Sequence, residues 1–253
     1  MADVHQGGSV ATLHNLTARP LEELEAELVG FSEKRPMGLL LPSLFSELET
    51  EAMPKILDEV KKVPYLSQIV IGLDRASEIQ YCEALEFFGE LPQHHRVLWN
   101  DGPRLRALDA ELQEQGLAPE EEGKGRNVWY CLGYMLATDK VEAIALHDCD
   151  IVTYDRSLLA RLIYPMANPQ FSYQFAKGYY PRIADGSLNG RVTRLLITPL
   201  LQSLQQVCGD STLFWGRLYI ERVCFDTSVL VFLYQCSADP LTGRFFWNRV
   251  GLE

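Results

Sequence analysis

The sequence predicts an α/β protein with a mostly parallel, Rossmann-like sheet and helices on both faces. Short apolar runs that read as buried strands alternate with segments whose apolar residues recur at helical spacing. This alternation is typical of βαβ units, which place parallel strands side by side under crossover helices. The chain has 253 residues, 47% hydrophobic and 23% charged. It is therefore long enough to bury a core, and its composition is that of an ordinary globular protein.

The predicted strands are short apolar runs that end at polar or turn-forming residues, at 38–42, 68–73, 96–99 and 142–147. The predicted helices cover 20–34, 46–62, 77–89, 104–115 and 127–137, and a further helix opens at 189–194 and runs to about 207. Gly89 closes the third helix, as glycine commonly does. In the tail, the β-branched and aromatic run at 229–234 is typical of a strand.

Charge and composition exclude several classes of function. The formal net charge is −11, which argues against broad, sequence-independent nucleic-acid binding. The chain has no run of about 18 apolar residues, so no membrane span is expected, and residues 1–17 do not read as a secretory signal. The six cysteines form no C-x-x-C pair and are expected to be reduced. We therefore expect a cytoplasmic protein.

Three segments are expected along the chain. Residues 1–20 are polar and read as a flexible arm, and residues 21–209 read as the main domain. Within that domain, 38–150 is the expected nucleotide-binding half and 151–209 the expected acceptor-binding half. Residues 211–253 form a divergent tail.

Ligands of parallel α/β sheets bind beyond the carboxyl ends of the strands. This rule selects the loops at 42–47, 74–77, 100–102 and 147–150. The last contains Asp148-Cys149-Asp150, directly after a buried strand. Two carboxylates at a strand end suit a divalent cation, because Mg²⁺ usually takes one or two carboxylates together with ligand phosphates. A capped turn is the alternative interpretation.

Two basic, glycine-containing segments could meet anions. Gly123-Lys124-Gly125-Arg126 precedes a predicted helix, where cations and free amide groups suit phosphate, although the Walker A spacing is absent. The segment 189–194 combines Gly190, Arg191 and Thr193 at a predicted helix start and suits a phosphate or carboxylate. Solvated loops and simple capping are the alternatives.

The order of these motifs resembles the glucosyl-3-phosphoglycerate synthases, which are retaining glycosyltransferases of the GT-A fold. The resemblance runs through Leu41-Pro42-Ser43-Leu44 with Glu47, Gly123-Lys124-Gly125, Asp148-Cys149-Asp150, Lys177-Gly178-Tyr179-Tyr180, and Gly190-Arg191-Val192-Thr193 followed by Pro199-Leu200-Leu201. It covers about residues 38–206. It implies a GT-A, nucleotide-diphospho-sugar transferase-like fold, transfer of glucose from UDP-glucose or another nucleotide sugar to 3-phosphoglycerate, a Mg²⁺ or Mn²⁺ cofactor, and a homodimer.

The resemblance also implies roles for single residues. Asp150 would hold the metal, and Asp150 and Arg191 are the expected catalytic residues. The nucleotide sugar is expected to contact Pro42, Ser43, Leu44, Glu47, Asp74, Lys124, Asp148 and Cys149. The acceptor is expected to contact Gly190, Arg191, Val192 and Thr193.

The chain departs from the family pattern after about Gly209. The family continues with a Gly-Glu-containing loop and a later histidine that completes the metal site, whereas every histidine here precedes Asp150. We therefore expect part of the catalytic centre to be missing, and the tail reads either as a native segment or as the product of a frame change or truncated gene. A nucleotidyltransferase and an inactive nucleotide-sugar-binding paralogue are the alternative functions.

Overall fold

A six-stranded sheet in the order β3-β2-β1-β4-β8-β5 forms the centre of the molecule. The computed structural model describes residues 18–119, 121–171, 173, 175–177, 182–184, 187–189, 199–200, 203 and 229–233. The strands of this sheet are β1 (Met37–Leu44), β2 (Leu66–Asp74), β3 (His95–Trp99), β4 (Ala143–His147), β5 (Phe175–Lys177) and β8 (Val229–Leu233). β1 to β4 are mutually parallel, as predicted, and β8 runs antiparallel to β4 and β5.

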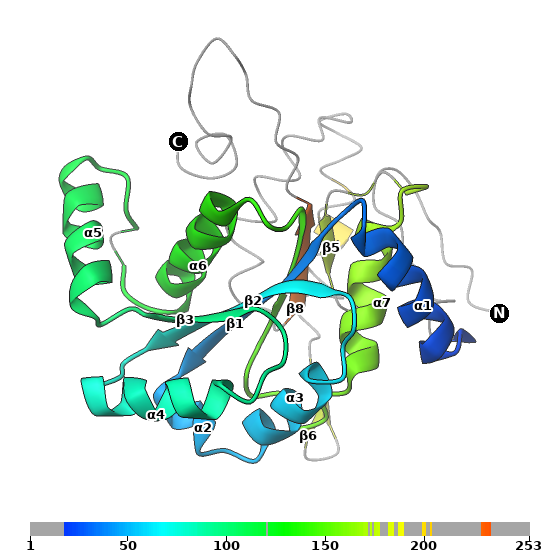
Figure 1. Ribbon diagram of the computed structural model, residues 1–253, viewed down its shortest axis with the longest axis horizontal. Helices are drawn as coiled ribbons and strands as arrows, with labels where there is room; N and C mark the ends of the chain where they lie inside the picture. Colours follow the sequence, from blue (N-terminus) through cyan, green and yellow to red (C-terminus); the bar gives the residue numbers. More distant parts are fainter. Residues whose placement is uncertain are drawn as a thin grey trace, which may run out of the picture.

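Helices cover the sheet on both faces, with α6 on one side and α2, α3 and α4 on the other (Figure 1). The helices are α1 (Leu21–Ser32), α2 (Phe45–Leu48), α3 (Ala52–Val60), α4 (Glu78–Phe88), α5 (Pro103–Glu114), α6 (Lys124–Thr138) and α7 (Arg156–Ala167). The sequence did not predict α7. A separate hairpin pairs β6 (Arg182–Ala184) with β7 (Ser187–Asn189).

Each face of the sheet has its own buried core, because successive strand residues point to opposite faces. Leu39, Leu41 and Ile69 pack with α1, α3, α4 and α7 in one cluster. Leu40 and Val70 pack instead against residues of α6 in the other. This arrangement explains why the strands read as continuous apolar runs and confirms the predicted doubly covered sheet.

The single helix predicted over 46–62 is wrong, because the chain forms α2 and α3 with a break at 49–51. Pro54 lies in the first turn of α3. Proline has no N–H to bond the carbonyl four residues earlier, and its ring clashes with that carbonyl, so the helix restarts just before Pro54. Proline is well accommodated in a first turn.

The strand predicted to end at Pro42 continues to Leu44. β1 pairs with β4 only as far as Leu40, so from Pro42 onward the strand is paired on one side alone. A residue without an N–H is accommodated where a strand has a free edge. Leu44 pairs with Asp74, which brings the carboxyl ends of β1 and β2 to the same level.

The second half of the chain is described only in short segments. The predicted strand at 229–234 is confirmed as β8. The helix predicted to open at Asn189 is wrong at that residue, which ends β7. Residues 190–198 lie outside the described part of the chain, as do residues 1–17, and the proposed domain boundaries stay a prediction. Within the described segments, no helix is both long and apolar enough to cross a lipid bilayer.

Candidate functional site

The carboxyl end of β1 supplies the first wall of the site. The Leu44 N–H donates to Glu47 Oε2 at 2.9 Å, and the Ser43 hydroxyl donates to the Leu44 carbonyl at 2.9 Å. Burial raises the pKa of Glu47, and the nearby carboxylates of Asp150 and Asp148 raise it further, against the lowering effect of the Leu44 hydrogen bond. Several acidic groups therefore share this region, and such a region favours a cation.

The N-terminus of α6 supplies the second wall, and Gly72 of β2 positions it. An ideal Cβ on Gly72 would lie 1.8 Å from Asn127 Oδ1 and 2.5 Å from Cys131 Sγ, so only glycine permits this approach. The Asn127 side chain, 3% exposed, donates from Nδ2 to the Gly72 carbonyl at 2.8 Å. These contacts hold the start of α6, with Gly123 and Lys124, beside the carboxyl ends of the strands.

Asp148, Cys149 and Asp150 follow β4 and form the third wall. The Lys124 ammonium donates to Asp148 Oδ1 and forms an ion pair with it. Cys149 is buried, whereas Asp150 is exposed. Burial raises the pKa of the Cys149 thiol well above its usual value, so this side chain is a neutral packing group rather than a nucleophile.

The loop that carries the two aspartates is anchored at both ends. His147 Nδ1 and the Tyr154 hydroxyl, both buried, lie 3.1 Å apart in a hydrogen bond across the loop. Burial lowers the pKa of His147 to about 3, so this imidazole is neutral at ordinary pH. At the far end, Asp155 Oδ1 accepts from the Ser157 N–H at 2.8 Å and caps α7. The loop geometry is therefore set from within the protein.

These walls enclose a cavity of about 290 Å³ at the carboxyl edge of the sheet. It is lined by Pro42, Ser43, Leu44, Glu47, Asp74, Arg75, Gly123, Lys124, Asn127, Asp148, Cys149 and Asp150. The structure thus brings together all eight residues expected to contact the nucleotide sugar, and Asp150 with them. The predicted acceptor residues Gly190, Arg191, Val192 and Thr193 lie outside the described residues.

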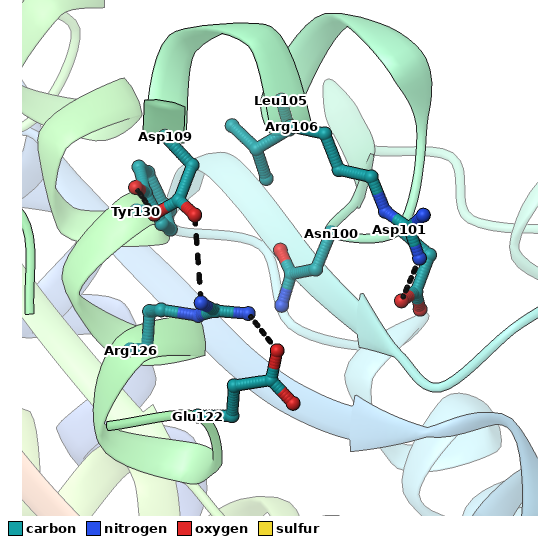
Figure 2. A pocket seen from close by; sticks show the side chains of 8 residues that line it. All are labelled: Asn100, Asp101, Leu105, Arg106, Asp109, Glu122, Arg126 and Tyr130. Carbon is teal, nitrogen blue, oxygen red and sulfur yellow. Dashed lines mark hydrogen bonds and ion pairs between the residues drawn. The ribbon is translucent and has the colours of Figure 1, made fainter. Parts of the chain in front are cut away.

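A second cavity, of about 320 Å³, lies between α5 and α6 (Figure 2). Its charged groups pair with one another: Arg126 contacts Asp109 at 3.5 Å and Glu122 at 3.3 Å, and Arg106 contacts Asp101 at 3.1 Å. Asp101 also accepts from the Ala76 N–H at 3.0 Å. The predicted ligand loop at 100–102 therefore lines this second cavity and supports the loop after β2.

Sequence reasoning did not assign Arg75 and Asn127 to the site. Arg75 belongs to the loop at 74–77 that the strand-end rule selected, so the signal was present but was applied only to Asp74. Asn127 follows Lys124 by three residues, and residues at this spacing share a helix face. The helix was predicted to begin at Asn127, whereas α6 begins at Lys124. With the correct start, this spacing would have placed Asn127 on the same side of the helix as Lys124.

The two curated proteins to which the chain is similar carry the same name. The chain is 49% identical over 209 residues to the glucosyl-3-phosphoglycerate synthase of Persephonella marina, covering 83% of this chain and 52% of that protein. It is 38% identical over 199 residues to the enzyme of the same name from Methanococcoides burtonii, covering 78% of this chain and 48% of that protein. The chain thus spans about half the length of the curated relatives it matches. No protein-family model matches it.

Among solved structures, the chain is similar to glucosyl-3-phosphoglycerate synthase from Mycobacterium tuberculosis in complex with Mn²⁺, UDP and glucosyl-3-phosphoglycerate. The TM-score is 0.51 at 18% identity, covering 88% of this chain and 63% of that one. A complex of the same enzyme with Mn²⁺, UDP-glucose and phosphoglyceric acid gives 0.50 at 18% identity, covering 85% and 62%. The resemblance drawn from the sequence motifs is confirmed: over about four fifths of its length the chain is homologous to the glucosyl-3-phosphoglycerate synthases, and it has their GT-A fold.

Proposed function

We propose that the chain carries the donor-binding part of a retaining glycosyltransferase that moves glucose from UDP-glucose to 3-phosphoglycerate and gives glucosyl-3-phosphoglycerate. One observation carries the proposal. Every described residue that the family resemblance assigns to the nucleotide sugar lines the cavity of about 290 Å³. The names of the homologues give the product, and the complex of the Mycobacterium tuberculosis enzyme with UDP-glucose and phosphoglyceric acid gives the donor and the acceptor.

The charges of the cavity suit a nucleoside diphosphate. Lys124 and the free N–H groups at the start of α6 present positive charge, which would stabilise the diphosphate of the departing UDP. Asp148 would accept a hydrogen bond from a ribose hydroxyl, once the ligand separates it from Lys124. The buried end of β1 would contact the uridine through Pro42, Ser43 and Leu44.

A divalent cation, Mg²⁺ or Mn²⁺, fits the same cavity. The described residues contain no group of three or more His, Cys, Asp or Glu side chains arranged to hold a metal by themselves. Mg²⁺ commonly needs only one or two carboxylates when substrate phosphates complete its shell. Asp150, exposed at the cavity, is the proposed protein ligand. When bound, the cation would neutralise charge on the diphosphate leaving group.

The acceptor half of the proposal rests on sequence alone. Gly190, Arg191, Val192 and Thr193 would hold the phosphate and carboxylate of 3-phosphoglycerate, and the Arg191 guanidinium matches both groups bidentately. With the acceptor held there, its hydroxyl would approach the glucose carbon from the face that UDP leaves. The new C–O bond would form as the bond to UDP breaks, and the hydroxyl proton would pass to the departing diphosphate oxygen. A cytoplasmic location and a homodimer remain part of the same proposal.

Release of UDP from UDP-glucose, with and without 3-phosphoglycerate, tests the proposal. Acceptor-dependent release in the presence of Mg²⁺ supports it, and Asp150→Asn should abolish that release. Asp58→Asn is the matched control, because it makes the same chemical change at an exposed position of α3 and should leave release unchanged.

Other outcomes identify the alternatives. Tight UDP binding with no release under any condition would identify an inactive paralogue. Pyrophosphate release from UTP, with no release of UDP from UDP-glucose, would identify a nucleotidyltransferase.

A further inference from the structure

Arg75 has an unusual backbone conformation directly at the donor cavity. Its φ is 55°, in the left-handed region that residues with a side chain rarely occupy. The residue follows β2 at the same level as the end of β1 and lines the cavity beside Asp74. Strain of this kind persists only where the surrounding structure fixes it, and it concentrates at functional sites.

Three hydrogen bonds hold the turn at Arg75 and Ala76, one from the end of β2 and two from β3 and the loop after it. The Arg75 N–H donates to Asp74 Oδ1 at 3.2 Å, the Ala76 N–H donates to Asp101 Oδ2 at 3.0 Å, and the Trp99 indole N–H donates to the Ala76 carbonyl at 2.8 Å. Trp99 is itself held by stacking on Tyr81, with ring centroids 4.9 Å apart. The protein therefore maintains the strained turn through β3 and α4.

The Arg75 side chain is exposed and forms no hydrogen bond or ion pair with any described residue. Lys124, the other cationic residue lining the cavity, is already paired with Asp148. The turn thus presents a guanidinium that the described part of the protein leaves available for a ligand.

The place of Arg75 along the sheet indicates which part of a nucleotide it would meet. Asp150 marks the diphosphate end of the proposed donor and Asp148 its ribose, both just after the carboxyl end of β4. The proposed uridine contacts lie at the end of β1. Arg75 follows β2, which is separated from β4 by β1 alone, or two strand spacings of about 10 Å in total. In a nucleoside diphosphate the ribose separates the phosphates from the base. This strand order puts Arg75, next to the end of β1, on the base side of the proposed donor.

We propose that Arg75 stacks its guanidinium on the face of the donor's nucleobase and so contributes to nucleotide affinity. The inference rests on the proposed function and deepens it. A planar guanidinium stacks well on aromatic faces, whereas the compact ammonium of lysine does not reproduce that geometry.

Three variants test the inference, with UDP and uridine as the probes. Arg75→Gly removes the side chain and adopts a positive φ without strain. Arg75→Ala removes the side chain but keeps the strain, and Arg75→Lys keeps the charge. All three should bind UDP about 10-fold more weakly than the parent chain, measured by calorimetry. They should lose uridine affinity, measured by saturation-transfer NMR, by the same factor.

Thermal unfolding separates binding from folding, since Arg75→Gly should melt no lower than the parent and above Arg75→Ala. A loss of UDP affinity without loss of uridine affinity would show contact with phosphate and overturn the proposal. Unchanged affinities in Arg75→Gly, or full affinity in Arg75→Lys, would also overturn it while leaving the proposed function intact. If the parent chain binds neither probe, the proposed function fails together with this inference.

Discussion

The close approach of α6 to β2 at Gly72 is the packing feature on which the cavity of about 290 Å³ depends, and Gly72→Ala perturbs it directly. The added Cβ would lie 1.8 Å from Asn127 Oδ1 and 2.5 Å from Cys131 Sγ, both in buried side chains. Overpacking of a buried contact costs about 1–3 kcal/mol. If α6 shifts to relieve the clash, the hydrogen bond from Asn127 to the Gly72 carbonyl is lost as well, at about 1 kcal/mol.

Urea unfolding measures the loss of unfolding free energy in Gly72→Ala, which we expect to be about 2–4 kcal/mol. UDP affinity should fall too, because Lys124 moves with the start of α6. Gly133→Ala is the matched control: Gly133 lies on the exposed face of the same helix with nothing within 4 Å of an added Cβ. That substitution should stabilise the protein by up to about 1 kcal/mol.

The double variant Gly72→Ala with Asn127→Ala tests whether the clash with the Asn127 side chain causes the destabilisation. Removal of the amide relieves the shortest contact, so the two changes should be less destabilising together than the sum of the single variants, with a coupling of about 0.5–3 kcal/mol. A Gly72→Ala protein with the parent's unfolding free energy would refute the reasoning, as would strictly additive effects in the double variant.

Three further predictions concern the caps and charges of the same region. Ser77→Ala removes the side chain that accepts from the Gln80 N–H at the start of α4, and should cost about 1 kcal/mol in urea unfolding without altering UDP affinity. Lys124→Gln should weaken UDP binding by calorimetry, more at low than at high salt because charges are screened; an equal loss at both would count against an electrostatic role. Burial lowers the pKa of His147 from 6.5 to about 3, so the unfolded chain takes up this proton first. Stability should therefore fall as pH drops from 6.5 toward 3, by up to about 1.4 kcal/mol per pH unit from this group, and His147→Gln should flatten that dependence in acid unfolding.

Strand positions could be predicted because β1, β2 and β4 are buried on both faces and so read as unbroken apolar runs. The break between α2 and α3 depends on Pro54, whose effect on the helix is local and could have been read from the sequence. α7 was not predicted because Pro165 lies inside it, and a proline in a helix interior usually ends or kinks the helix. α7 packs against α1, and this contact depends on the tertiary structure rather than on the local sequence.

The strand-end rule and the order of the motifs both select the loops at 42–47 and 147–150, and both loops line the cavity of about 290 Å³. Asp74 and Asp150 are far apart in sequence, and parallel strand pairing alone brings their loops to one edge. Arg75 could not be assigned a role from the sequence, because its significance lies in a backbone angle fixed by Asp101 and Trp99 from the next strand. Asn127 could not be placed at the cavity from the sequence, because its position depends on the packing of α6 against Gly72.

Calorimetric titration of UDP into the whole chain, with Mn²⁺ and then with EDTA, measures whether the cavity is a cation-assisted nucleotide site. We expect one UDP per chain, bound only when the cation is present, and loss of that binding in Asp150→Asn. UDP bound equally well in EDTA, or no UDP bound in either condition, would contradict a cation-assisted nucleotide site at the ends of β1, β2 and β4.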